Sequence, residues 1–264
     1  MFNQGFDNLF YYPIHWHYYK DFAIKAHTKN ISLFFSNMLN YIIKNNLTNN
    51  FELINMVYGF INHYTLDTII HPFINYQVKN LEISHTKIEF SLDSKISENF
   101  NNRIYKEIIS RFHFSKELTN ALDYIFLKTY NEKNIGKIFN RSHNNDYYIY
   151  RYFVNDKKGY KTKLYKIVDF ILHNKKFRLQ DNTFYVKNFD ERILNFEKQK
   201  WHHPNNKKEI YNYSYDELYN YCIIICTKLN TLAYKVLHNN YNSQKLVKNI
   251  AKISIKNIPE LLEI

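Results

Sequence analysis

Cysteine, glycine and proline are scarce in this chain, which has two, four and four of them among 264 residues. Two cysteines are too few for a disulfide framework, so the composition favours a reducing compartment. Both of them, Cys222 and Cys226, lie one helical turn apart in an apolar stretch, a pattern typical of buried thiols. The few glycines form no phosphate-binding loop, and the sequence contains no internal repeat.

Long apolar runs are absent as well. A spanning helix requires about 18 or more consecutive apolar residues, and no stretch of this sequence meets that requirement. No secretory signal precedes Asn3. These absences predict a protein without a transmembrane segment that stays in the cytoplasm, or one that is secreted if its N-terminus is truncated.

Aromatic and basic residues are in excess: the chain has 25 Tyr, 21 Phe and a formal net charge of +12. Positive charge attracts phosphate-rich partners such as an anionic lipid surface or nucleic acid. The alternative is codon drift in an AT-rich genome, which enriches Asn, Ile and Lys. We favour drift, because the densest basic run, at 205–208, is too short to form a tract.

Apolar residues recur at helical spacing through most of the chain. The sequence predicts a single all-α domain over 1–264, with a metal-binding core at about 1–130 and a helical C-terminal half at 131–264. Residues 1–20 are predicted to form a loop, and TFYV at 183–186 a short strand. Pro72 is expected to end the central helix. The predicted helices cover 21–44, 51–70 and 84–94, two segments of 98–130, 215–237 and 243–254.

Side chains of metal-ligand type stand in columns on two of these helices. His63 and Asp67 are four residues apart and His71 is four further on, so the three share one helix face. His85 and Glu89 repeat this spacing. Imidazole and carboxylate are donors that zinc accepts, and paired ligands on two helices are a common way to build such a site. The alternative, hydrogen-bonded core histidines and surface carboxylates, fits less well because a carboxylate among apolar residues needs a partner or a metal.

Five segments together point to a known family: NQGFDNLFYYP (3–13), HTKNISLFFSNML (27–39), GFINHYTLD (59–67), HPFI (71–74) and HTKIEFSLD (85–93). They resemble the zinc-dependent phospholipase C family, in a diverged bacterial branch. That family binds up to three zinc ions inside an all-helical domain, a fold that it shares with the three-zinc single-strand nucleases. The resemblance implies one zinc ion held by Asp7, His27, His63 and Asp67, and a second held by His71, His85 and Glu89.

The resemblance also implies an activity. Asp7 would act as the general base as well as a ligand, and a zinc-bound hydroxide would attack the phosphorus of a phospholipid. The secreted members of the family place their third histidine six residues after the aspartate, whereas His71 follows Asp67 by four. They also carry a helix before the position of Asp7 that completes a third zinc site. The sequence therefore implies two zinc sites and either an incomplete third site or a truncated gene model.

Three functions stay open at this point. The first is a hydrolase acting on a phospholipid or another phosphodiester, with peripheral contact to a membrane surface. The second is a phosphodiesterase of the single-strand nuclease kind, since aromatic residues can stack bases, although we regard nucleic acid as the weaker partner. The third is a non-catalytic zinc-binding helical domain. For single residues, a turn role for Asp7 and a packing role for His27 are the alternatives. We interpret Trp201 as a structural anchor or pocket wall.

Overall fold

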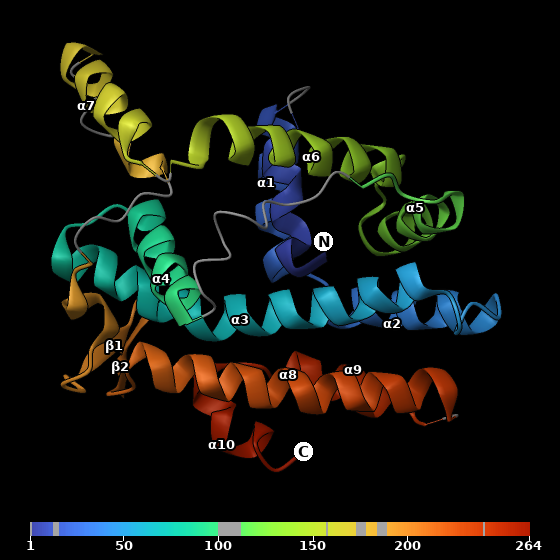
Figure 1. Cartoon of the computed structure of the whole chain (residues 1–264). Helices are drawn as coiled ribbons and strands as arrows, with labels where there is room; N and C mark the ends of the chain where they lie inside the picture. Colours follow the sequence, from blue (N-terminus) through green and yellow to red (C-terminus); the bar gives the residue numbers. More distant parts are fainter. Residues whose placement is uncertain are drawn as a thin grey trace. The chain divides into compact units, whose positions relative to one another are not determined.

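The computed structural model of the protein describes residues 2–12, 16–99, 112–156, 158–172, 178–183, 189–239 and 241–264. Within these residues the chain is mostly helical and contains one two-stranded sheet (Figure 1). The prediction of a helical fold is therefore confirmed. None of the described helices combines the length and hydropathy that crossing a bilayer requires.

The chain groups into two compact units. Unit 1 holds Met1–Ile69, Arg111–Asp146 and Tyr219–Ile264, and unit 2 holds Ile70–Ser110 and Tyr147–Leu218. The helices of unit 1, some of which continue into unit 2, are η1 (Phe2–Tyr11), α1 (Trp16–Thr28), α2 (Ile31–Lys44), α3 (Phe51–Leu81), α5 (Lys116–Tyr130), α6 (Ile135–Ile149), α8 (Tyr215–His238), α9 (Ser243–Ala251), η6 (Ile255–Asn257) and α10 (Ile258–Leu261). The prediction of a single domain stays a prediction.

An aromatic cluster forms the centre of unit 1. The ring of Phe6, from η1, lies 5.1 Å from the ring of Phe34 and 5.2 Å from that of Phe60, measured between centroids. Phe126 of α5 joins the same cluster at 6.0 Å. Aromatic side chains bury large apolar areas and gain further from edge-to-face contacts of this kind. The cluster therefore anchors η1, the segment that carries Asp7, against α2, α3 and α5.

Helix α8 packs against the part of α3 that belongs to unit 1. Asn230 donates a hydrogen bond from Nδ2 to Oδ1 of Asn62, at 2.8 Å. Cys222 is buried and Cys226 is partly buried, and both are free thiols, as the apolar stretch around them predicted. Burial raises the pKa of each thiol, which keeps both protonated at neutral pH.

Unit 2 holds the rest of α3, the start of α8 and the small sheet. Its other elements are α4 (His85–Asn99), η3 (Tyr150–Val154), α7 (Tyr160–Leu172), η4 (Leu179–Asn182), η5 (Glu191–Leu194), β1 (Trp201–His203) and β2 (Asn206–Tyr211). Strands β1 and β2 pair antiparallel. Trp201 is buried, and its ring lies 5.4 Å from Phe73 and 5.1 Å from Tyr211. Its Nε1 donates a hydrogen bond to the carbonyl oxygen of Tyr213, at 3.1 Å, so the structural role expected of Trp201 is confirmed.

Two of the predicted boundaries are wrong near the N-terminus. Residues 1–20 were expected to form a loop, yet η1 and the start of α1 occupy most of the described part of this segment. The helix expected over 21–44 is divided, because α1 ends at Thr28 and α2 begins at Ile31. Asn30, with φ 59°, takes the left-handed conformation at the break, which asparagine tolerates better than most residues.

The expected end of the central helix at Pro72 is also wrong. Helix α3 continues through Pro72 to Leu81. A proline inside a helix removes one backbone hydrogen bond and disfavours the turn before it. Beyond it, Phe73, Ile74 and Gln77 are buried, and this packing outweighs the local preference.

Two further predictions lie mainly outside the described residues: the strand at 183–186 and the first of the two helices in 98–130. The second of those helices is α5. Helices α4, α8 and α9 begin within a few residues of their expected positions.

Replacing Trp201 should test its role as a packing residue of unit 2. We expect Trp201→Ala to lower the free energy of unfolding by about 3–5 kcal/mol, because it leaves a cavity beside Phe73 and Tyr211. Trp201→Phe, the control, keeps most of the packing and loses the bond to Tyr213, so it should cost only about 1–2 kcal/mol. Urea denaturation followed by circular dichroism measures both. Equal stability of Trp201→Ala and wild type would contradict the assignment.

Candidate metal centres

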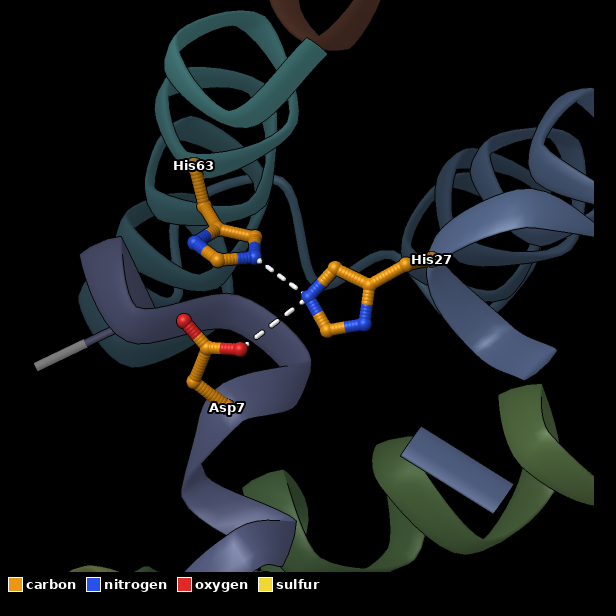
Figure 2. Close-up of side chains that lie close together, drawn as sticks. All are labelled: Asp7, His27 and His63. Carbon is orange, nitrogen blue, oxygen red and sulfur yellow. Dashed lines mark hydrogen bonds and ion pairs between the residues drawn. The ribbon is translucent and has the colours of Figure 1, made fainter. Parts of the chain in front are cut away.

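Three ligand-type side chains converge in unit 1 and form what we call the first cluster: Asp7, His27 and His63. Each offers one ligand atom, and these atoms lie within 4.8 Å of one another. Nε2 of His27 lies 3.1 Å from Oδ1 of Asp7 and 3.0 Å from Nε2 of His63 (Figure 2). Ligand atoms placed tetrahedrally about 2 Å from one zinc ion are separated by about 3.3 Å. The spacing of these donors therefore fits a metal ion.

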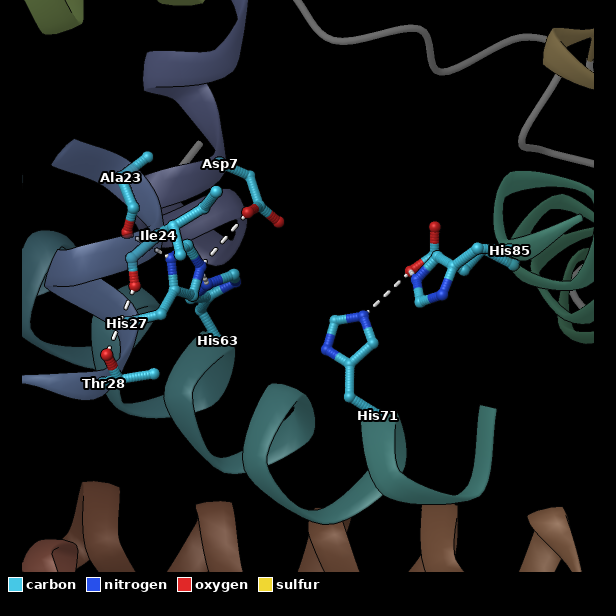
Figure 3. Close-up of polar contacts among 9 residues, drawn as sticks. Asp7, Ala23, Ile24, His27, Thr28, His63, His71 and His85 are labelled. Carbon is cyan, nitrogen blue, oxygen red and sulfur yellow. Dashed lines mark hydrogen bonds and ion pairs between the residues drawn. The ribbon is translucent and has the colours of Figure 1, made fainter. Parts of the chain in front are cut away.

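Each member of the first cluster comes from a different element: Asp7 from η1, His27 from the last turn of α1 and His63 from the middle of α3. Nδ1 of His27 lies 2.7 Å from the carbonyl oxygen of Ala23 (Figure 3). A carbonyl only accepts, so Nδ1 carries a hydrogen, and Nε2 is the nitrogen that faces the cluster. Metal-binding histidines are commonly oriented by a backbone bond of this kind.

Gly5 allows η1 to approach α3 closely. Its backbone has φ 47°, in the left-handed region, and a Cβ atom at this position would overlap the ring of His63. Only glycine combines this conformation with so close an approach. Gly5 therefore sets the position of Asp7, two residues later, relative to His63.

The carboxylate of Asp7 acts on the pKa of its neighbour His27. Burial by itself lowers the pKa of His27, but the hydrogen bond and charge of Asp7, with a smaller effect from the charge of Asp67, leave that pKa raised. His63 is 7% exposed, and the side chains of His27 and Asp7 are 13% and 41% exposed. Asp7 is thus the member of the cluster that is most open to solvent.

Asp67 does not converge with the other three. It lies one turn after His63 on α3, and its charge acts on His27. Its carboxylate is not among the ligand atoms that lie within 4.8 Å of one another. Its role as a ligand stays a prediction.

The second cluster lies within unit 2 and consists of His71, His85 and Glu89. Oε1 of Glu89 lies 3.1 Å from Nε2 of His71 and 3.1 Å from Nε2 of His85. The imidazole rings of His71 and His85, which are labelled in Figure 3, are stacked with centroids 5.2 Å apart. Burial raises the pKa of Glu89, but hydrogen bonds and charge from both histidines lower it to about 2. The carboxylate is therefore ionised and available as a ligand at any physiological pH.

One carboxylate near the first cluster was missed in the sequence. Asp146 of α6 is buried, and its Oδ2 accepts a hydrogen bond from Nε2 of Gln4, at 2.5 Å. Its Oδ1 has no hydrogen-bond partner among the described residues. Burial raises the pKa of Asp146 and the Gln4 bond opposes this, while the charge of Asp7 adds to the rise, so the pKa is about 7. Helical spacing could have indicated its burial, because Asp146 lies on the same face of α6 as the buried residues Ile135, Phe139 and Ser142.

A cation suits this arrangement for two physical reasons. Asp7 and Asp146 repel each other, and a positive ion beside Asp7 would offset that repulsion. The histidines and carboxylates of both clusters are the donor types that zinc accepts, whereas calcium and magnesium prefer oxygen alone.

Comparison with known proteins gives no family for the chain: no family model, no curated protein and no solved structure matches it. The case for a metal therefore depends on the geometry of the two clusters and on their donor chemistry.

Gly5→Ala should disturb the first cluster without removing a ligand. We expect zinc affinity at this cluster to fall at least about tenfold, since the new methyl group displaces the His63 ring and strains the backbone. Gly159→Ala is the matched control, because Gly159 also has a positive φ, of 75°, but lies in unit 2 at the start of α7. Competition with a chromophoric chelator measures both. Unchanged affinity in Gly5→Ala would contradict the close approach.

Asp146→Asn should change how stability depends on pH. The folded-state pKa of about 7 lies above the ordinary carboxyl value, so between the two the folded chain holds a proton that the unfolded chain releases. Stability of the metal-stripped wild type should therefore fall as pH rises through this window, by up to about 1.4 kcal/mol per pH unit from this group. Asparagine removes that contribution, and the variant should be the more stable protein at pH 8. Parallel stability curves from urea denaturation at pH 4 to 8 would contradict the assignment.

Proposed function

We propose that the protein is a zinc-dependent phosphodiester hydrolase of phospholipase C type. The observation that carries the proposal is the pair of three-ligand clusters, each built from two imidazoles and one carboxylate with contacts of 3.0–3.1 Å. Histidine and carboxylate ligands suit zinc, and a zinc ion held in this way can bind the oxygens of a phosphoryl group. The sequence segments around the ligands support the same family.

The different exposure of the three residues in the first cluster suggests different roles for them. His27 and His63 are largely buried and oriented by their surroundings, so they hold the site. Asp7 is the most exposed of the three side chains, so it can accept the proton of the attacking water as general base. When bound, zinc supplies charge that stabilises the phosphoryl oxygens and lowers the pKa of water. The second cluster supplies Glu89 as a fully ionised ligand between two histidines.

A single-strand nuclease activity is the second candidate. The rings of Tyr148 and Tyr152 are stacked, with centroids 6.2 Å apart and an interplanar angle of 11°, and both side chains are exposed. The guanidinium group of Arg151 lies 5.7 Å from the ring centroid of Tyr152. Exposed aromatic rings beside a cation are the usual means of stacking unpaired bases.

Zinc content and turnover, measured together, test the proposal. The purified protein should hold two zinc ions per chain and should cleave a phosphatidylcholine dispersion, and a chelator should abolish that cleavage. Single-stranded DNA is assayed in parallel, and cleavage of DNA alone would favour the second candidate. A chain that binds zinc but cleaves neither substrate would be a non-catalytic zinc-binding domain.

Variants of the ligand residues should separate the binding of zinc from the catalytic step. We expect His63→Ala and His85→Ala each to lose one zinc ion and to melt at a lower temperature, since binding energy is also folding energy. Asp7→Asn should keep most of the zinc and lose about 10²-fold or more in rate. His202→Ala is the control, because His202 is exposed and belongs to neither cluster, and its Nδ1 lies 3.1 Å from the carbonyl oxygen of Lys207. If both ligand variants keep two zinc ions, the clusters are not metal sites.

A further inference from the structure

Helix α7 turns an apolar row of side chains toward solvent. Tyr160, Leu164 and Ile167 are 67%, 57% and 58% exposed. Their spacing of four and then three residues puts them on one stripe of the helix. Ile171, 65% exposed, continues the stripe by one more turn. We call these four residues the α7 row (Figure 1, yellow helix).

Polar contacts hold the opposite side of α7 against the protein. Asp169 is the buried residue of this helix, and its carboxylate accepts hydrogen bonds from the backbone N–H groups of Leu179 and Gln180, at 2.8 and 2.9 Å. Thr162 donates through both its backbone N–H and its Oγ1 to Oδ2 of Asp156, each at 2.7 Å. Rotating the α7 row inward would break these bonds and leave charged oxygens unsatisfied. The outward orientation is therefore set by the polar side of the helix.

Within α7, the charged side chains that border the α7 row have one sign. Lys163 and Lys166 are exposed on one flank of the row, and Lys161 lies on the other flank. Asp169, the one carboxylate of α7, is buried on the far side and committed to backbone groups. A row of exposed apolar side chains bordered by lysines is the pattern of helices that lie in the interface of an anionic membrane.

We propose that α7 docks the protein on an anionic lipid surface, with the α7 row in the lipid interface and the lysines at the phosphate level. A second copy of the chain suits this row less well, because a two-fold contact brings the same patch onto itself and would set lysines against lysines. The inference goes beyond the proposed hydrolysis, since docking requires neither a bound metal nor turnover.

Co-sedimentation with lipid vesicles tests the docking. The wild-type chain should bind vesicles of phosphatidylglycerol more tightly than vesicles of phosphatidylcholine, and the difference should shrink as salt is raised from about 0.05 to 0.5 M. The double variant Leu164→Ser with Ile167→Ser should bind at least about tenfold more weakly to both. Lys163→Glu with Lys166→Glu should lose the preference for phosphatidylglycerol.

The matched control is Ile223→Ser with Ile224→Ser on α8, where both side chains are also exposed, by 49% and 43%. It should bind like wild type, and circular dichroism checks that every variant is folded. The proposal is overturned if wild type does not bind phosphatidylglycerol vesicles, or if the Leu164 and Ile167 variant binds them equally well. A wild-type dimer that this variant dissociates, seen by light scattering, would overturn it in favour of a second copy. Loss of zinc or of hydrolysis leaves these results unaffected, so the two proposals fail separately.

Discussion

The cost of placing carboxylates next to an apolar core is the constraint on which unit 1 depends. The ring of Phe6 packs 5.3 Å from that of His27 and also belongs to the aromatic centre of the unit, so the first cluster borders the core directly. Asp7 and Asp146 bring negative charge to this border. The amide of Gln4 donates to Oδ2 of Asp146, while Oδ1 has no hydrogen-bond partner among the described residues. Such an arrangement is unfavourable unless a proton or a cation offsets the charge.

The two clusters satisfy this constraint in different ways. In the first cluster, the histidines are largely shielded from water and are held by neighbours such as Ala23 and Gly5. In the second, all three side chains are partly exposed, and Glu89 is paired with two imidazoles. Shielding from water strengthens electrostatic interactions and makes an unpaired polar group costly, whereas exposure weakens the interactions and lowers that cost. Loss of one ligand should therefore disturb the fold more at the first cluster.

Helix α7 exposes its apolar side chains and buries a polar one, Asp169. Most helices of a globular protein bury an apolar stripe and expose polar residues. The contacts of α7 with its neighbours include a carboxylate capping the backbone of η4 and a threonine bound to Asp156, and its apolar residues face outward. An exposed apolar stripe lowers the solubility of a protein, and exposed stripes of this kind often mark a binding surface.

The sequence by itself determined the helices that carry His63, His85 and Glu89 and the spacing of these ligands, because helical periodicity is a local property of three or four neighbouring residues. Tertiary structure alone decided which ligands meet. It brought Asp7 and His27 to His63, kept Asp67 out of that group of ligand atoms and placed Asp146 beside it. It also carried α3 through Pro72 and turned the apolar side of α7 outward. A local pattern states which side chains share a face, but what that face meets depends on contacts with segments distant in the chain, such as Phe73 with Trp201.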